Sequence, residues 1–325
     1  MKQKFLIIRR LAPAMAVLLL ATAAWAAEPA EIKLLTVGNS FADNSTRYLE
    51  DFAKSAGRKL RLYKANLGAH SLQMHVGYLR AYDANPEDPK GSPYTGVANP
   101  ATDSKPKLSL RKALELEKWD YVTIQQVSTL SYQSASFEPW ASELIGYIHR
   151  YAPTAKVLGL ETWTHREDSW MYQKLTTMER MHAAIQKAYA ELSARHGIEI
   201  LPVGDAFQAA RGTPEWKFQY PDPNFDRATA KPDQLPEQKG SLNVGWKWEK
   251  DATTKEMKLV NDPAHCNAAG QYLATAVLYE ALFGGVDKVT FCPPQLTAEQ
   301  AASLREIARQ TVADSPIGKS LASRR

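Results

Sequence analysis

The stretch Ile32-Lys33-Leu34-Leu35-Thr36-Val37-Gly38-Asn39-Ser40-Phe41 decides the fold. Residues 33–37 form a short apolar run that predicts a buried strand, and this run ends in a small turn that presents Ser40. A helical pattern follows over residues 47–56, and Gly57 is a typical C-terminal stop for it. A strand, a polar turn and a helix in this order indicate the first unit of an alternating α/β chain.

The rest of the chain continues the alternation. Further strands are predicted at residues 60–65, 121–125, 156–160 and 198–203, and further helices at 110–117, 171–195 and 270–283. Apolar strands that alternate with helices indicate a parallel sheet with helices on both faces. We therefore predict a flavodoxin-like, three-layer α/β/α sandwich around a mostly parallel five-stranded sheet.

Two long stretches depart from this pattern inside the single domain that we expect over residues 27–314. Residues 83–106 and 211–251 are rich in proline and polar residues, and loops of this length are usually functional. The second stretch also contains many aromatic residues, which indicates a folded insertion near a site: Trp216, Phe218, Tyr220, Phe225, Trp246 and Trp248. The polar, basic residues 315–325 are expected to fray.

The N-terminus has the pattern of an export signal. Four basic residues precede an apolar stretch over residues 11–23, and Ala24-Trp25-Ala26 is a typical cleavage site. We therefore expect removal of residues 1–26 and a periplasmic or extracellular protein, with an uncleaved anchor as the alternative. The formal charge falls from +5 to about +1 without this segment, so the charge gives no indication of nucleic-acid binding.

The two cysteines, Cys266 and Cys292, fit an exported chain. In an oxidising compartment they could form a disulfide, and two free thiols are the alternative.

Three residues at the two ends of the domain have the chemistry of nucleophilic catalysis. Ser40 follows the first strand, where open α/β sheets bind their ligands and where the next helix directs N–H groups. A serine nucleophile needs a base that a carboxylate orients, and Asp262 and His265 supply this pair just before a helix. We expect residues at this spacing in a turn or first helical coil to face the same way. The alternatives are a helix cap for Ser40 and a surface position for His265.

At this point the chain resembles the SGNH, or GDSL-like, hydrolase superfamily over most of residues 31–285. Val37-Gly38-Asn39-Ser40-Phe41 is similar to the nucleophile block of that family, and Asp262-Pro263-Ala264-His265 is similar to its late Asp-x-x-His block. Asn66-Leu67-Gly68 is similar to the block whose glycine N–H contributes to the oxyanion hole. The resemblance implies a Ser40–His265–Asp262 triad and an oxyanion hole that includes the N–H groups of Ser40 and Gly68.

The third block is the least regular part of the resemblance. Residues 119–126, Trp-Asp-Tyr-Val-Thr-Ile-Gln-Gln, are similar to a Trp-Asp-x-Val-x-x-Gln subgroup signature and lack the usual Gly-x-Asn-Asp. A glutamine amide in place of the asparagine would complete the oxyanion hole. Gln125 and Gln126 point to opposite faces of a strand, so at most one of them is expected to serve, and the sequence leaves both open.

Several other residues are candidates for substrate binding. Trp163, His165 and Arg166 follow the fourth strand at the same edge of the sheet, and the last two could bind a substrate carboxylate; ordinary rim charges are the alternative. Trp246 in the aromatic insertion is a candidate surface for sugar rings. His70 and His75 lack further metal ligands at a useful spacing, and Asp205 resembles a helix cap. No phosphate loop or dinucleotide motif is present, so no metal or cofactor is expected.

The resemblance implies an exported carboxylic ester hydrolase. The absence of an extended apolar flap, together with the aromatic insertion, favours a small acyl group on carbohydrate as the substrate, and many exported members of the family deacetylate polysaccharides. A lipase or lysophospholipase, a non-catalytic glycan-binding protein and an O-acetyltransferase with a membrane partner are the alternatives. We expect no nucleic-acid partner and no stable membrane anchor.

Overall fold

The computed structural model of the protein describes residues 31–96, 107–173 and 177–322. Five strands carry the central sheet: β1 (Ile32–Gly38), β2 (Leu60–Asn66), β3 (Tyr121–Ile124), β4 (Lys156–Leu160) and β5 (Glu199–Leu201). The helices that follow or precede them are α1 (Ser40–Ser45), α2 (Leu49–Ser55), α3 (Leu72–Ala84), α4 (Leu110–Glu115), α5 (Trp140–Tyr151), α6 (Met178–His196), α7 (Val203–Arg211), α8 (Ala268–Phe283), α9 (Ala298–Asp314) and α10 (Pro316–Ala322).

The sheet has the order β2-β1-β3-β4-β5 and all of its strand pairs are parallel. Gly38 lies opposite Asn66, and Val37 lies opposite Ile124, so the carboxyl ends of β2, β1 and β3 coincide. The segments that follow these strands therefore meet at one edge of the sheet. The predicted fold class is confirmed, and the five predicted strands correspond to the five observed ones.

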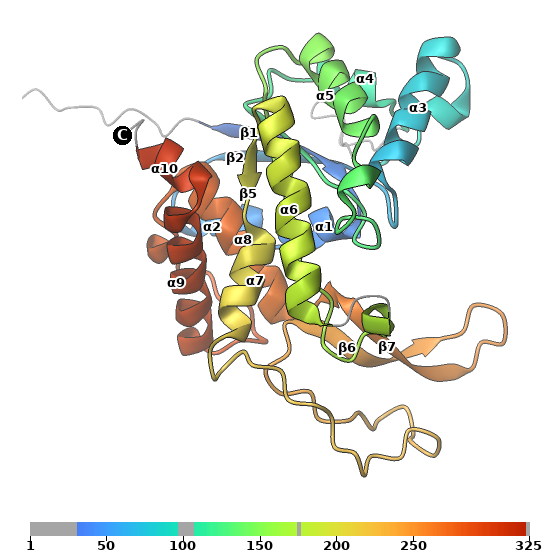
Figure 1. Cartoon of the computed structure of the whole chain (residues 1–325), viewed down its shortest axis with the longest axis vertical. Coiled ribbons are helices and arrows are strands. Elements are labelled where there is room, and N and C mark those ends of the chain that lie inside the picture. The colour runs from blue at the N-terminus through green and yellow to red at the C-terminus, as the bar shows by residue number, and fades with distance from the viewer. Residues whose placement is uncertain (1–30, 97–106, 174–176, 323–325) are drawn as a thin grey trace, which may run out of the picture.

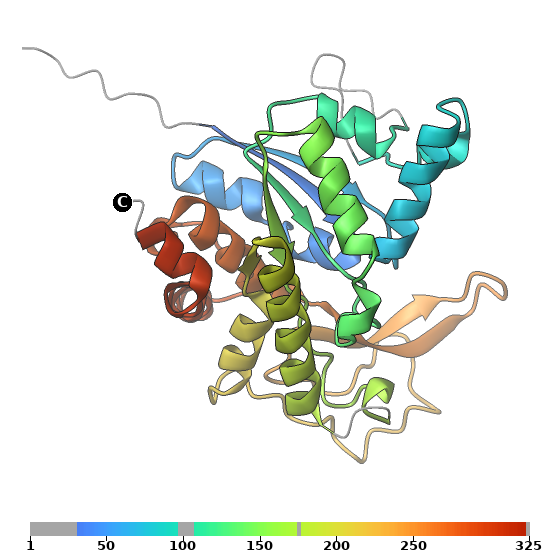
Figure 2. The same cartoon turned by 45° about the horizontal axis from the view of Figure 1, so that its top comes forward.

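Alternating strand residues divide the core into two clusters, one on each face of the sheet. Leu34 packs on the side of α1, α2, α7, α8, α9 and α10, whereas its neighbour Leu35 packs on the side of α3, α4, α5 and α6. Figures 1 and 2 show α8, α9 and α10 grouped on one side of the sheet and α3, α4 and α5 on the other. Two helical layers thus enclose a buried sheet, as near-continuous apolar strands require.

A hairpin outside the central sheet was not anticipated from the sequence. The strands β6 (Asn243–Lys250) and β7 (Met257–Cys266) pair antiparallel and project from one end of the molecule (Figure 1). Asp262 and His265 lie on β7, so the prediction of a turn or first helical coil at these positions is wrong. Residues 212–242, which precede the hairpin, contain no helix or strand, although Trp216 and Phe218 are buried.

Two further differences concern the helices. The predicted helix 171–195 begins only at Met178, and a short 3₁₀ turn, Trp170–Gln173, precedes it. At the C-terminal end, α9 was not anticipated, and α10 occupies most of the segment that we expected to fray. The side chain of Ile317 on α10 is buried against the α8 side of the core, which explains the order there.

The predicted export segment, residues 97–106 of the first long loop and residues 323–325 lie outside the described residues. No helix in the described ranges is long and apolar enough to cross a membrane.

Candidate active site

Ser40 is held at the carboxyl end of β1 by hydrogen bonds that its two preceding residues form with α1 and with the loop after β2. It is the first residue of α1, and Asn39 caps that helix by accepting a hydrogen bond from the Phe41 N–H through its side-chain oxygen. The Asn39 amide also donates to the His70 carbonyl at 3.0 Å. The Gly38 carbonyl accepts the Leu67 N–H from the β2 loop, so the serine turn is fixed to the neighbouring loop.

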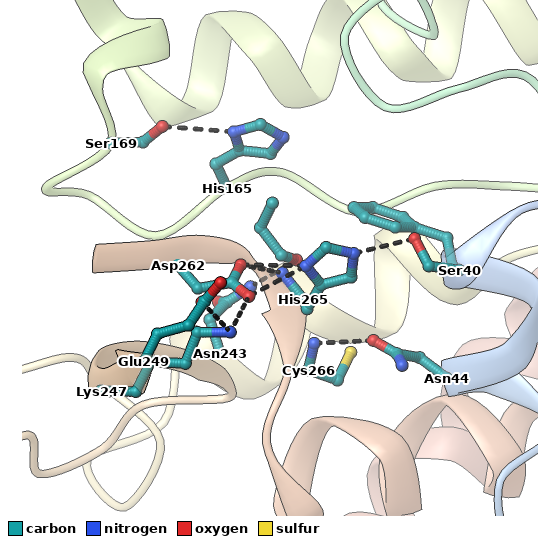
Figure 3. Close-up of polar contacts among 12 residues, drawn as sticks. Ser40, Asn44, His165, Ser169, Asn243, Lys247, Glu249, Asp262, His265 and Cys266 are labelled. Carbon is teal, nitrogen blue, oxygen red and sulfur yellow. Dashed lines mark hydrogen bonds and ion pairs between the residues drawn. The ribbon is translucent and has the colours of Figure 1, made fainter. Parts of the chain in front are cut away.

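Ser40, His265 and Asp262 form one hydrogen-bonded chain, although Ser40 and His265 are 225 positions apart in the sequence. Ser40 Oγ lies 2.8 Å from His265 Nε2. On the other side of the ring, His265 Nδ1 lies 3.0 Å from both Asp262 oxygens (Figure 3). The carboxylate holds the Nδ1–H tautomer, so Nε2 faces the serine with its lone pair.

A bulge in β7 brings Asp262 and His265 to the same side of the strand. Asn243 pairs with Cys266 and Gly245 pairs with Asp262, so the β7 segment is two residues longer than the β6 segment opposite it. In a regular strand, residues three apart point to opposite faces. The two extra residues interrupt this alternation, so the side chains of Asp262 and His265 can point to the same face. The Asp262 carboxylate also accepts the His265 backbone N–H at 3.1 Å, which closes the bulge locally.

Backbone and side-chain groups from the loop after β4 and from β6 hold the bulge in place. The Arg166 N–H donates to the Pro263 carbonyl at 2.8 Å, which ties the loop after β4 to β7. The Ala264 carbonyl accepts hydrogen bonds from Trp163 Nε1 and from the buried Asn243 amide. The position of the imidazole is therefore set by contacts that lie outside the cleft.

The electrostatics of the site favour an ionised Asp262. Burial opposes ionisation, but the side-chain and backbone hydrogen bonds from His265, together with Lys247, outweigh it and hold the pKa of Asp262 well below its usual range. Lys247 Nζ lies 3.4 Å from Asp262 and 3.3 Å from Glu249. The carboxylate is thus available as a permanent partner for the imidazole ring.

These residues open onto a cleft of about 500 Å³. Its walls combine the serine turn, the loops after β2, β3 and β4, and the hairpin: Asn39, Ser40, Phe41, Ala69, Val127, Ser128, Thr129, His165, Trp170, Lys247, Glu249, Val260, Asn261, Asp262, Pro263, Ala264 and His265. Trp170, Lys247 and residues 127–129 were not identified from the sequence. Residues 127–129 directly follow the third block, which was an available signal, whereas nothing in the sequence pointed to Lys247.

The predicted oxyanion-hole residues have different positions. Ser40 begins α1, and within the described ranges its backbone N–H has no acceptor, as is usual for the first residue of a helix. Gly68 is exposed and does not line the cleft; the next residue, Ala69, does so in a left-handed conformation with φ 59°. The backbone of this loop thus reaches the cleft one residue later than predicted.

Neither predicted glutamine lines the cleft. The Gln126 amide donates to Ser136, and its oxygen accepts the N–H groups of Leu72 and Val127, so its side chain is committed to the surrounding loops. The Gln125 side chain is buried beside Gly38, and its amide atoms have no hydrogen-bond partner among the described residues. The structure therefore does not support the prediction that Gln125 or Gln126 completes the hole.

Three of the four predicted substrate-binding residues do not reach the cleft. Trp163 is fully buried and stacks between Phe41 and Phe207, with ring centroids 4.1 and 4.9 Å away. Arg166 is also buried, and its guanidinium binds Asp168, Gln238 and Asn261. Trp246 lies outside the cleft, with the Arg227 guanidinium over its ring.

His165 is the fourth of these residues, and it does line the cleft. The structure gives no support to a substrate-binding role for Trp163, Arg166 or Trp246, because each of these side chains is engaged by other residues outside the cleft.

The remaining sequence predictions concern structural residues. Cys266 is buried and Cys292 is exposed, and both are free thiols. His70 contacts Gly68 and Tyr78, and His75 contacts Gly38 and Tyr94. Asp205 lies in the first turn of α7 and accepts a hydrogen bond from His182. No group of three potential metal ligands occurs in the part of the chain that the structure describes.

The fold and site thus define a three-layer α/β/α protein with a Ser–His–Asp chain at the carboxyl edge of its sheet. Residues 33–226 match the model of the family described as Domain of unknown function (DUF4886). The chain belongs to this family. No curated protein matches it.

Solved structures extend the comparison. The chain is similar to a DUF4886 family protein from Bacteroides uniformis, with 21% identity, a TM-score of 0.66 and coverage of 88% of this chain and 96% of the other. It is also similar to a lipase/acylhydrolase from Enterococcus faecalis (14% identity, TM-score 0.36, coverage 57% and 83%). A mutant acetylxylan esterase from Geobacillus stearothermophilus has 8% identity, a TM-score of 0.39 and coverage of 80% and 95%. The first likeness supports the fold, and the other two carry no argument about activity.

Proposed function

We propose that the protein is a serine ester hydrolase with Ser40 as its nucleophile. The observation that carries the proposal is the continuous chain from Ser40 Oγ through His265 to Asp262, at 2.8 and 3.0 Å, beside an open cleft. A hydroxyl, an imidazole and a carboxylate in this order form a device for transferring a proton away from an attacking serine. Neither a glycan-binding protein nor a structural helix cap needs such an arrangement.

In the first half of the reaction, Ser40 Oγ attacks the ester carbonyl carbon while His265 Nε2 takes the hydroxyl proton. The carbonyl oxygen becomes an oxyanion, and the Ser40 N–H at the start of α1 is placed to stabilise it. The C–O bond to the alcohol then breaks, and the leaving oxygen receives the proton from His265. An acyl group remains on Ser40.

In the second half, His265 takes a proton from water, and the hydroxide attacks the acyl carbon. The bond to Ser40 Oγ breaks, and the proton returns from His265 to the serine. Asp262 keeps the ring in one tautomer and stabilises the imidazolium in both halves. The low pKa of Asp262 means that it does so as a carboxylate.

We further propose that the substrate is a small acyl ester of carbohydrate and that the protein acts after export. Trp170 is 56% exposed at the cleft and offers a flat face suited to a sugar ring. Lys247, Glu249 and Asn261 add polar groups to the same cleft. A lipase or lysophospholipase is the alternative, and faster turnover of long-chain than of acetyl esters would establish it.

The test of the proposed function is p-nitrophenyl acetate hydrolysis by the mature protein. Ser40→Ala should lower turnover by roughly 10³-fold or more, because it removes the nucleophile. Ser45→Ala is the matched control, since Ser45 is a buried serine on the same helix whose hydroxyl donates to the Phe41 carbonyl. Equal rates in Ser40→Ala and the unaltered protein would reject the proposal.

A further inference from the structure

His165 has one ring nitrogen in use and one without a partner. Its side chain is buried, with 3% exposure, and Nδ1 lies 3.2 Å from Ser169 Oγ. Nε2 is also buried, and no atom of the described residues hydrogen-bonds to it. A buried polar atom without a partner is costly, and the rare instances call for an explanation. Because His165 and Ser40 line the same cleft, a bound ligand is the natural partner.

The hydrogen bonds around Ser169 determine which ring nitrogen of His165 carries the proton. Ser169 Oγ already accepts the Met171 N–H at 3.2 Å. Within the described residues, His165 Nδ1 is the acceptor that remains for the serine hydroxyl proton. Ser169 therefore donates to Nδ1, which leaves the ring proton on Nε2. The unpartnered atom is thus an N–H donor at the cleft.

The ring is neutral and firmly placed. Burial, followed by the charges of Arg211 and His265, lowers the pKa of His165 to about 4, in spite of the opposing effect of Asp262. The His165 carbonyl accepts the Tyr172 hydroxyl at 2.6 Å, which fixes the loop that carries the ring. A neutral N–H suits a hydroxyl or ether oxygen. It does not suit the substrate carboxylate that the sequence suggested for His165.

The sheet order places His165 on the leaving-group side of the nucleophile. Ala69 follows β2 and His165 follows β4, and the order β2-β1-β3-β4 puts these loops on opposite sides of Ser40. The oxyanion is expected near the Ser40 and Ala69 backbone, so the alcohol extends the other way. Figure 3 shows the His165 ring facing the His265–Asp262 pair from another segment, with Ser169 beside the ring at its left.

We propose that His165 Nε2–H donates a hydrogen bond to a second oxygen of the leaving alcohol and so selects esters of polyhydroxylated alcohols such as sugars. This inference rests on the proposed function, because it assumes that Ser40 attacks an ester in this cleft. It makes His165 a specificity-determining residue that contacts the substrate and takes no part in the proton transfers of the triad.

The test compares two acetate esters with six-membered rings, a mono-O-acetylated methyl glucoside and cyclohexyl acetate. Only the glucoside offers further oxygens to His165. His165→Phe removes the donor, and we expect kcat/KM to fall roughly ten- to hundredfold for the glucoside ester and to stay unchanged for cyclohexyl acetate. His165→Gln retains an N–H donor and should recover part of the loss. His149→Phe, at an exposed histidine of α5, is the control.

Three outcomes would overturn the inference. An equal loss on both esters would show that His165 supports the fold or the triad in general. Unchanged kcat/KM on both esters would show that the ring does not contact the alcohol. If the unaltered protein hydrolyses cyclohexyl acetate but not the glucoside ester, the proposed esterase function is supported and the inference about His165 is contradicted. If Ser40→Ala and the unaltered protein are equally inactive on both, the proposed function itself fails.

Discussion

At the scale of single residues, the site depends on a carboxylate that stays charged. The hydrogen bonds from His265 and the nearby Lys247 overcome the burial of Asp262 and hold its pKa well below the usual range. The ionised carboxylate therefore keeps the imidazole tautomer that leaves Nε2 free for Ser40. Under the proposed function, this carboxylate orients the catalytic imidazole, and its lowered pKa also links it to the stability of the folded chain.

Asp262→Asn separates these two contributions. We expect kcat to fall roughly 10³- to 10⁴-fold, because the amide favours the wrong tautomer of His265. The pKa of Asp262 in the folded chain lies below its value in the unfolded chain. Its stabilisation is therefore present above the ordinary aspartate pKa of 3.8 and is lost as the pH falls below that value. The variant should show a shallower loss of unfolding free energy in acid.

The control for this variant is Asp251→Asn, at the turn of the same hairpin. Asp251 also has a lowered pKa, caused first by its hydrogen bond from Lys258, but it does not line the cleft. Denaturant unfolding at several pH values and steady-state kinetics give both readouts. A kcat loss in Asp251→Asn as large as in Asp262→Asn would contradict the assigned roles.

A second residue-scale prediction concerns His75, which supports the serine turn. Its Nε2–H donates to the Gly38 carbonyl at 3.0 Å, and its Nδ1 accepts from the Tyr94 hydroxyl at 2.8 Å. Burial lowers the pKa of His75 to about 4. The unfolded chain binds a proton near pH 6.5 and the folded chain does not, so folding stability falls as the pH drops from about 6.5 to about 4.

His75→Phe removes this titration. The variant is expected to be less stable at neutral pH, where both hydrogen bonds are lost, and to lose less stability than the unaltered protein between pH 6.5 and 4. Guanidinium unfolding at pH 7, 5.5 and 4.5 measures the difference, and His149→Phe serves as an exposed control. A parallel decline in His75→Phe and the unaltered protein would show that His75 titrates normally.

The individual site residues were predictable to different degrees. Ser40, Asp262 and His265 belong to two short local patterns, and the sequence pointed to them only through the pairing of these patterns and the family resemblance; the structure brings the three side chains together. The sequence assigned Gln126 and Arg166 to the cleft, but in the folded chain other partners occupy their side chains. These partners, such as Ser136 and Gln238, come from distant segments, and the sequence alone does not place them next to Gln126 and Arg166. Lys247 could not be identified from the sequence either, because its position beside Asp262 depends on the pairing of β6 with β7.

At the scale of elements, the bulge in β7 is the feature that joins fold to chemistry. It turns two residues that a regular strand would separate toward the same cleft, and the buried Arg166 and its loop brace it from behind. Gly245 lies on β6 opposite the bulge, with φ +67°, and an added Cβ would collide with the Arg166 guanidinium. The hairpin therefore requires glycine there for two separate reasons.

Gly245→Ala should cost about 2–4 kcal/mol of unfolding free energy, since it adds a steric clash to the conformational cost of a positive φ. It should also lower esterase turnover by displacing Arg166 from the bulge. Gly57→Ala isolates the conformational cost, because Gly57 has φ +65° and nothing within 4 Å of an added Cβ. Thermal or denaturant unfolding compares the two; equal losses would contradict the proposed contact between position 245 and Arg166.

The central elements were predictable because each strand is a compact apolar run between polar turns. The hairpin was not, since residues 211–251 contain several prolines and the strand β6 mixes tryptophan with lysine and glutamate. Its sheet is small and partly exposed, so its sequence lacks the apolar signal of the central strands. The helix α9 was also missed, although Thr297 and Gln300 form a capping box at its start.

At the scale of the whole molecule, the C-terminal helices complete the layer that covers one face of the sheet. Ile317 on α10 is 2% exposed and belongs to the same core cluster as α8 and α9. Ile317→Ala should lower the unfolding free energy by about 2–4 kcal/mol, because it leaves a cavity, with esterase turnover unchanged at temperatures where the variant is folded. Lys319→Ala, on the exposed side of α10, is the control. Identical stability of the two variants would contradict the packing of α10.

The central claim is that Ser40 is an activated nucleophile, and covalent labelling tests it most directly. A fluorophosphonate reacts with a serine whose proton a neighbouring base removes, and peptide mass spectrometry locates the adduct. We predict one stoichiometric adduct on Ser40, strongly slowed in His265→Ala and absent in Ser40→Ala. An unlabelled Ser40 in the intact protein, or labelling whose rate does not depend on His265, would contradict the account.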